Sequence, residues 1–568
     1  MRQKMRNDKK LNIIGLALMS TLVLSGCSFF QRTSSTKKSS AASTSGALTS
    51  ENASSSAEES SEDDSEIINP INKTKFNYNY KDYAQHCYLN YDFTPSVGSP
   101  KLLVIPVWFT DSESCIHPNH LQDVKDDIET AYFGTAQEVG WQSVRSYYYT
   151  MSQGRCDLGG VVSDWYETGE AMDAYGNDSD KTENLVKTAS DWYFEQEGSL
   201  PRSYFDSDGD GFLDGVMLIY AAPDYAAAYT DWYSDNDDRE NFWAYTSYTF
   251  AEADETAPVP NAYFWASYDF MYDAGTANVR TGLYFWHSGD ASGGSVDAHT
   301  YIHEMGHMFG LPDYYDYSGQ YSPAASFSMQ DHNVGGHDPY SALALGWADP
   351  YVPEDSCTLT IKPFQNNGRD LVLLQPAGFN VDGSPFDEYV LIELYTPTGL
   401  NENDCSHAYR ENEYYSSAPL GPNDVGLRIW HVDARLVQIN TRFGRISVDI
   451  THPKKVPNED NLYFMMTNTY DHPYKDMTGR ISVCGSTYAN YNILQLIRND
   501  RNVTYHCSDD LSGSDLFKDG DTFTCSRYNT QFVNGSKLNS GDTLGWTVNV
   551  SLTGTGTSAR ATLTLTRD

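Results

Sequence analysis

The stretch AHTYIHEMGHMFGLPDYYD, residues 298–316, places two histidines, a glycine and an aspartate at spacings that restrict its local structure. His303 and His307 stand four residues apart, so on an α-helix both imidazoles lie on one face, one turn apart. Gly310 is suited to end such a helix, and Asp313 follows once the chain has reversed. The pattern H-E-x-x-H-x-x-G-x-x-D therefore predicts that His303, His307 and Asp313 bind one Zn²⁺.

Three protein ligands leave a fourth coordination position to water, which is typical of a catalytic zinc site. Glu304 lies about 100° round the helix from His303, too far to be a ligand but able to hydrogen-bond that water. Bound zinc lowers the pKa of water to about 7, and we predict Glu304 as the general base. A chance occurrence on a surface helix is the alternative, but the added glycine and aspartate disfavour it.

His299 is a rival for the third ligand position, because it lies one turn before His303 on nearly the same face. Three histidines along one straight helix would span about 12 Å, which is too far for a single ion. We therefore predict that His299 packs beside the site or hydrogen-bonds a ligand.

The motif HEMGHMFGLPDYYD resembles the zinc motif of the immune inhibitor A family of bacterial metalloproteases, which are metzincin-like. The resemblance extends through SVRSYYYTMSQGRCDLGGVVSDWYETG and GLRIWHVDA, over roughly residues 98–435. It implies a zinc endopeptidase acting on peptide or protein substrates. It also implies that Met329, in SFSMQD, is the Met-turn residue whose side chain packs under the metal.

The chain departs from many metzincins two residues after that methionine. They often carry a tyrosine there that steadies the oxyanion, whereas this chain has Asp331. His332, His337 and Tyr340 are candidates for that task, each with a structural role as the alternative. The oxyanion donor stays open.

A second metal site is predicted in DSDGDGFLDG, where Asp206, Asp208, Asp210 and Asp214 occupy positions 1, 3, 5 and 9 of an EF-hand-like loop. The carbonyl of Phe212 falls at position 7. Position 12 is not glutamate and a strand follows, so the loop is not an EF-hand. We predict a structural Ca²⁺, also because relatives carry a similar loop. The alternative is a solvated acidic turn.

The amino terminus predicts export and lipid anchoring. Residues 1–26 combine a basic start with an apolar run too short to span a bilayer, as in signal peptides. The run ends in LSGC, which resembles a lipobox, so Cys27 is the expected lipidation site on the extracellular face of a bacterial membrane. An ordinary signal peptide with a chance cysteine is the alternative. Residues 27–67 are Ser-rich and are expected to form a disordered linker.

The remaining chain predicts an α+β metzincin-like protease domain at 68–350 and an all-β, sandwich-type region at 351–568. Buried strands are expected at 101–109 and 215–220, and an edge strand able to pair with substrate at 158–165. Helices are expected from Asn119 and from Thr182. Whether residues 68–98 are a removable pro-segment stays open, as does the choice between disulfides and buried thiols for the eight cysteines after Cys27.

A net charge of −39 repels phosphate backbones and argues against nucleic-acid binding. A non-catalytic surface-binding protein on a protease-derived scaffold is the rival function, with the β-rich region as its adhesive part. The 42 tyrosines would suit glycan contact in that case, although core tyrosines look the same in sequence.

Overall fold

The computed structural model describes most of the chain from residue 67 onward. The described residues are 67–75, 81, 92–139, 141–176, 179–222, 242–249, 251–272, 296–316, 319–366, 369–377, 379, 386–406, 419–442, 445–454, 462–464, 467–468, 481–483 and 491–568. The predicted signal peptide, Cys27 and nearly all of the linker lie outside them. In the described parts, no helix has the length and apolar character needed to cross a membrane.

The first sheet has the strand order β2-β1-β4-β6-β5, with the short β3 also paired to β1. All its pairings are parallel except that of β5 with β6. The strands are β1 (Lys101–Trp108), β2 (Gly159–Val162), β3 (Tyr166–Glu167), β4 (Gly215–Tyr220), β5 (Tyr245–Tyr248) and β6 (Ala262–Ser267). β4 and β6 are buried along their whole length, which explains their continuous apolar sequences. The predictions of buried strands at 101–109 and 215–220 are confirmed.

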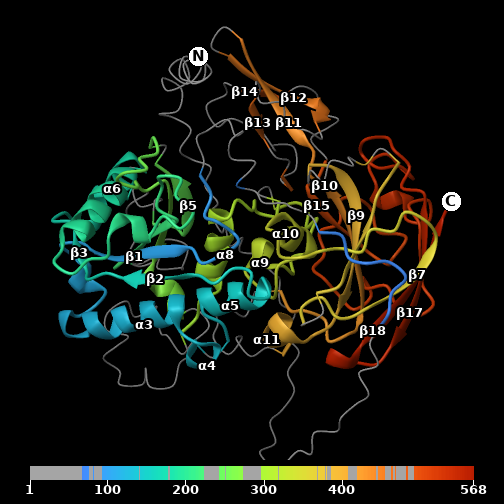
Figure 1. Ribbon diagram of the computed structural model, residues 1–568, viewed down its shortest axis with the longest axis horizontal. Coiled ribbons are helices and arrows are strands. Elements are labelled where there is room, and N and C mark those ends of the chain that lie inside the picture. Colours follow the sequence, from blue (N-terminus) through green and yellow to red (C-terminus); the bar gives the residue numbers. More distant parts are fainter. Residues whose placement is uncertain are drawn as a thin grey trace, which may run out of the picture.

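Helices pack around this sheet (Figure 1). The helices are α3 (Leu121–Phe133), α4 (Ala136–Val139), α5 (Val144–Met151), α6 (Ser179–Glu195), α8 (His299–Met308), α9 (Met329–His332) and α10 (Pro339–Ala344). Of these, α9 and α10 lie between the sheet and strands β9 (Glu388–Tyr395) and β10 (Gly426–Asp433) (Figure 1). Short 3-10 turns occur at η1 (Ser112–Ser114), η2 (Pro118–His120), η3 (Met172–Ala174), η4 (Arg202–Tyr204) and η6 (Tyr268–Tyr272). The expected start of α3 at Asn119 was wrong, because η2 occupies that position and His120 is the N-cap. All ten residues of α8 are buried.

Strands dominate after residue 350, with short helical turns between them. One sheet has the order β15-β10-β9-β8, a second β16-β17-β18-β7 and a third β13-β11-β12-β14. The strands are β7 (Cys357–Ile361), β8 (Leu371–Leu374), β9 (Glu388–Tyr395), β10 (Gly426–Asp433), β11 (Leu436–Arg442), β12 (Arg445–Lys454), β13 (Leu462–Phe464), β14 (Ile481–Val483), β15 (Leu494–Ile497), β16 (Thr522–Phe523), β17 (Trp546–Thr553) and β18 (Arg560–Arg567). The helical turns are η10 (Gly399–Asn401), α11 (Glu402–Ser406), η13 (Asn529–Gln531) and η14 (Gly556–Ser558).

The sheet containing β9 and β10 lies between two hydrophobic cores. Leu391 belongs to the core shared with β1, β4 and α8, whereas its neighbour Ile392 belongs to the core shared with β17 and β18. Successive side chains of a strand point to opposite faces, so both faces of this antiparallel sheet are buried. Figure 1 shows β9 and β10 between the helices α8 to α10 and the strands β17 and β18. The chain is thus a mixed α/β structure with several sheets, in which one core crosses residue 350.

The described residues before β1 contact both parts of the molecule. The Asn69 side chain donates to the Thr360 carbonyl and accepts from its backbone N–H, at 3.0 and 2.8 Å, so it pairs with β7. Lys73 forms an ion pair of 2.7 Å with Asp370. Further along, Thr94 donates its backbone N–H to the carbonyl of Met308 at the end of α8, at 2.9 Å. Residues 92–98 therefore pack as part of the body that carries α8.

Six cysteines in the described residues form no disulfide: Cys115, Cys156, Cys357, Cys405, Cys507 and Cys525. Cys87 and Cys484 lie outside the described residues.

Candidate metal site

The metal motif lies on α8 and the reversed chain that follows it. Gly310 adopts a φ of +100°, a left-handed conformation that favours glycine. Backbone bonds from Gly310 to the His307 carbonyl and from Leu311 to the Gly306 carbonyl, 2.9 and 3.1 Å long, close the helix end. The chain can then turn back and bring Asp313 beside the helix.

The structure brings His303, His307 and Asp313 together in a buried group. The two Nε2 atoms are 3.1 Å apart. Asp313 Oδ1 lies 3.0 Å from His303 Nε2 and 3.2 Å from His307 Nε2. Ligands at zinc–ligand distances of about 2.0–2.2 Å in a tetrahedron lie roughly 3.3–3.6 Å apart, so these three atoms have nearly the spacing that one zinc ion requires.

Backbone carbonyls fix the orientation of both imidazoles. His303 Nδ1 lies 2.7 Å from the carbonyl of Met329, and His307 Nδ1 lies 2.7 Å from that of Leu311. A carbonyl only accepts hydrogen bonds, so each Nδ1 carries a proton, and each Nε2 is the nitrogen that faces Asp313 and is available to a metal ion. Two imidazole nitrogens and a carboxylate oxygen that face one another in a buried group could hold a metal ion.

The charges around the group favour a cation as well. Burial opposes a charge on His307, but the carboxylates of Asp313 and Glu304 raise its pKa to about 9. Burial also acts against the charge of Asp313, yet His307 and His303 hold the pKa of that carboxyl below its usual range. The field at the meeting point of the ligands thus attracts positive charge.

Glu304 is buried next to this group, and its two carboxylate oxygens have different surroundings. Thr246 on β5 donates from Oγ1 to Glu304 Oε2 at 3.0 Å. Glu304 Oε1 has no hydrogen-bond partner among the described residues. Burial raises the pKa of the carboxyl, against the lowering effect of His307 and His303. Thr246 thus holds Oε2 in place, while Oε1 is left to accept a hydrogen bond from a ligand.

Thr246 is a site residue that sequence reasoning missed, and its bond to Glu304 shows that the β5 edge of the first sheet lies beside the metal group. β5 is the antiparallel edge strand of the first sheet and contacts α8. The strand expected at 158–165 exists as β2, but it forms the opposite edge and packs against α3. The edge strand expected at 158–165 is thus present, but it lies at the opposite edge of the sheet from β5 and α8.

Met329 is fully buried at the start of α9, and its backbone carbonyl touches His303 as described above. Its neighbour Gln330 packs against α8 at Gly306. A Cβ at Gly306 would lie 2.1 Å from Gln330 Oε1 and 2.6 Å from its Cδ. Gly306 therefore allows the Met329 segment to approach the helix between the two histidine ligands.

His299 lies apart from the three ligands, at the first residue of α8. Its ring stacks on Trp141, with centroids 4.0 Å apart and planes 7° apart. Its Nδ1 lies 2.6 Å from Asp297 Oδ1, and its Nε2 lies 3.6 Å from Asp404 Oδ2. The structure thus gives His299 carboxylate partners outside the metal group.

The three oxyanion candidates occupy different surroundings. His337 and Tyr340 are fully buried in the core, and His337 Nε2 lies 3.3 Å from the Tyr148 hydroxyl. His332 is 45% exposed and bonds Asp331 through Nδ1 at 2.6 Å. Asp331 in turn accepts from the backbone of Ser326 at 3.0 Å. His332 is the candidate of these three that solvent and substrate can reach.

The predicted calcium loop is only partly assembled. Asp206, Asp208 and Asp210 form a group that could hold a cation. Asp214 turns away and accepts from the backbone of Lys101 at 2.7 Å and from Ser207. The Lys81 ammonium pairs with Asp208 and lies 2.7 Å from Asp210 and 3.4 Å from Asp92. Phe212 is buried beside the loop, and its amide bonds Asp210 at 3.0 Å.

Comparison with known families adds one finding. Residues 99–197 match the family described as immune inhibitor A peptidase M6, catalytic domain. The match supports the immune inhibitor A family, as the motifs predicted, and with it a peptidase. No curated protein matches the chain. The matched segment ends before α8, so the candidate metal ligands rest on the geometry of His303, His307 and Asp313.

Replacing Gly306 by alanine tests the close approach of Gln330 to the helix. We expect Gly306→Ala to weaken zinc binding about tenfold, because the new methyl group displaces the buried Gln330 side chain, whose Nε2 lies 3.4 Å from His307 Nδ1. Zinc affinity is measured by competition with a chelator of known affinity. Parental affinity together with a parental Tm would show that Gln330 moves aside without disturbing the ligands.

Proposed function

We propose that this protein is a zinc endopeptidase anchored by lipid to the extracellular face of a bacterial membrane. The observation that carries the proposal is the buried meeting of His303 Nε2, His307 Nε2 and Asp313 Oδ1 within 3.2 Å, with Glu304 beside them. Zinc held by these three atoms would act as a Lewis acid toward water and a peptide carbonyl.

Glu304 moves the proton in this proposal. Thr246 holds Oε2, so Oε1 is the oxygen that faces an incoming water. Oε1 takes the proton from that water as its oxygen attacks the peptide carbonyl, and later delivers the proton to the departing amine. Burial raises the pKa of this carboxyl and so strengthens it as a base.

The substrate is a peptide or protein segment in extended conformation. β5 pairs with β6 on one side, and its other side has no partner strand among the described residues. Thr246 lies on this strand next to Glu304, so a peptide added along the open edge would pass the metal group. His332 is the proposed donor to the oxyanion because it is the exposed candidate.

We also propose that the first domain is metzincin-like and that the C-terminal region is an all-β sandwich. An antiparallel edge strand beside the metal helix, with a methionine turn below the ligands, is the arrangement that we interpret as metzincin-like. Strands β7, β16, β17 and β18 pack face to face with the β9–β10 sheet through a common core, which supports a sandwich in the C-terminal region.

The rival function, a non-catalytic surface-binding protein, would not need Glu304. A buried carboxylate without a chemical task is costly. The presence of Glu304 in this buried group, with one carboxylate oxygen held by Thr246, favours the enzyme over the binding protein.

Glu304→Gln separates the two functions. We expect zinc to be retained while kcat for peptide cleavage falls by about 10²–10⁴-fold, because the amide keeps the shape but cannot take a proton. Activity is measured on a peptide library with the full-length protein in detergent, with the exposed Glu129→Gln on α3 as the control. Activity within tenfold of the parent would contradict the proposed base.

Calcium at Asp206, Asp208 and Asp210 is the second part of the proposal. At 100 times its Kd, Ca²⁺ should stabilise the parent by about 2.7 kcal/mol and raise its Tm. We expect the Asp208→Ala/Asp210→Ala double variant to lose this response. Lys81→Met should enlarge the response, since the ammonium no longer competes for the same carboxylates. A parent Tm that is unchanged by Ca²⁺ at matched ionic strength would mean that the loop is a solvated turn.

The lipid anchor rests on the sequence around Cys27. We expect Cys27→Ala to move the protein from the membrane fraction to the soluble fraction with an unchanged Tm. Membrane retention of the variant that detergent abolishes would identify a different anchor.

A further inference from the structure

The first turn of α8 precedes His303 and His307, and it is hydrogen-bonded to the buried carboxylate of Asp297. Asp297 Oδ1 accepts from both the backbone N–H and Nδ1 of His299, at 3.0 and 2.6 Å. Trp141 covers the flat face of the imidazole. The side chain of His299 is therefore fixed in position and orientation, one helical turn before His303.

A second carboxylate reaches His299 from beyond residue 350. Asp404 on α11 places Oδ2 3.6 Å from His299 Nε2. Burial opposes a charge on His299, but Asp297 and Asp404 together raise its pKa to about 10. At neutral pH His299 is therefore a cation held between one carboxylate next to α8 in the chain and one carboxylate of the C-terminal region.

The same C-terminal segment holds the loop that follows Met329. Asp404 Oδ2 accepts the backbone N–H of Gly335 at 2.6 Å, and Asn401 Oδ1 accepts that of Gly336 at 3.1 Å. Gly335 has a φ of +66°, and a Cβ there would lie 2.9 Å from Asn401 Oδ1. The turn is shaped to fit these two side chains.

Other bonds attach the Met329 loop to the same region. The Arg428 guanidinium donates to the Phe327 carbonyl at 3.3 Å, and the Leu511 amide donates to the Ala325 carbonyl at 2.8 Å. The Met329 carbonyl that orients His303 is therefore carried by a loop resting on β10 and on residues near 511.

We propose that Asp404 is a positioning residue of the metal site, which couples the C-terminal region to the peptidase reaction by holding His299 and the Gly335 turn at once. This inference rests on the proposed function. Asp404 touches both supports of His303: the helix that carries its backbone and the loop whose carbonyl fixes its ring. Loss of its charge leaves the buried His299 cation with a single carboxylate and frees the start of α8 to shift.

Asp404→Asn is the sharpest test, because the amide oxygen can still accept from Gly335 while the charge is lost. We expect zinc affinity and kcat each to fall about tenfold, with KM within twofold of the parent, because a small displacement of His303 affects the reacting geometry more than substrate binding. The Co²⁺-substituted protein should show an altered visible absorption spectrum, which reports ligand geometry independently of activity. Asp404→Glu restores the charge and should recover most of the loss.

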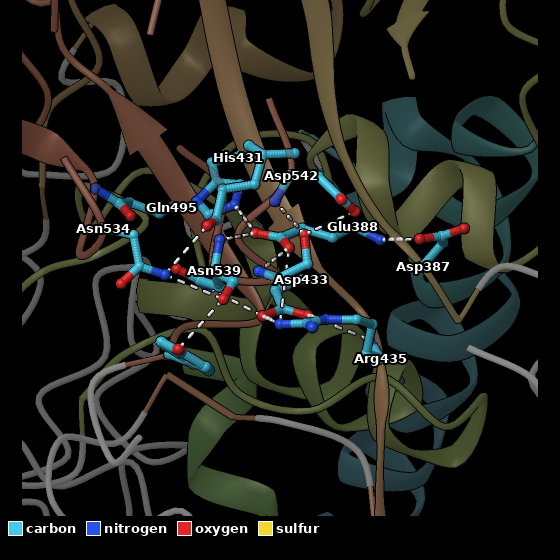
Figure 2. Close-up of polar contacts among 12 residues, drawn as sticks. Asp387, Glu388, His431, Asp433, Arg435, Gln495, Asn534, Asn539 and Asp542 are labelled. Carbon is cyan, nitrogen blue, oxygen red and sulfur yellow. Dashed lines mark hydrogen bonds and ion pairs between the residues drawn. The ribbon is translucent and has the colours of Figure 1, made fainter. Parts of the chain in front are cut away.

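Asp433→Asn is the matched control. Asp433 is a buried carboxylate of the same region, paired with Arg435 through Nε at 2.7 Å and with Asn539 at 2.9 Å. Figure 2 shows it in a network with Glu388 and His431 at the ends of β9 and β10. None of the contacts described for this network involves α8. Asp433→Asn should therefore lower Tm but leave zinc affinity and the Co²⁺ spectrum unchanged.

The outcomes separate this inference from the proposed function. Parental zinc affinity, kcat and Co²⁺ spectrum in Asp404→Asn overturn it, even if Tm falls as far as in the control. If Asp404→Asn does not fold, Asn401→Ala removes the neighbouring acceptor of the Gly335–Gly336 turn, and parental values there overturn the inference as well. A parent protein that neither binds zinc nor cleaves peptides would overturn the proposed function, and the inference with it.

Discussion

The metal site depends on holding two imidazole nitrogens and a carboxylate oxygen within 3.2 Å of one another away from water. Without a cation their lone pairs repel, so the protein must fix each group through its other atoms. The Met329 carbonyl orients His303, and the Leu311 carbonyl orients His307. Much of the surrounding fold can be understood as support for those two carbonyls and for the helix between them.

The parts of the site that were predictable from sequence are local. His303, His307 and Asp313 fall within eleven residues, so helical periodicity and one glycine are enough to bring them together. Thr246 contacts Glu304 across a sequence separation of 58 residues, from a strand in an aromatic, acidic segment without a clear period. No local pattern marks such a residue, because its role comes from the position of β5 at the sheet edge. The central strands of the first sheet were predictable, whereas this edge was not.

His299 and Asp214 show a different limit of sequence reasoning. Helix geometry could exclude His299 as a zinc ligand, but it could not identify Trp141 and Asp404 as its partners, since these come from distant segments. The EF-hand-like spacing included Asp214, yet the residue bonds Lys101 and Ser207 because a β-strand begins directly after it. Spacing predicts which residues can meet only as long as the backbone between them follows the expected path.

The buried ion pairs Glu393–Arg428 and Asp404–His299 are best explained by the positions they fix rather than by a gain in stability. Glu393 and Arg428 pair at 2.7 Å on adjacent strands inside the core, and Arg428 also reaches the Phe327 carbonyl. Removing such charges from water costs several kcal/mol per ion, and an apolar pair would stabilise the fold at least as well. A guanidinium and a carboxylate, however, accept only a narrow range of distances and directions. Placed between the β9–β10 sheet and the Met329 loop, they fix that loop against the sheet, and His299 and Asp404 likewise fix the start of α8 against α11. On this view the C-terminal region sets the alignment of the candidate metal site, and apolar contacts alone would leave the Met329 loop free to slide over the sheet.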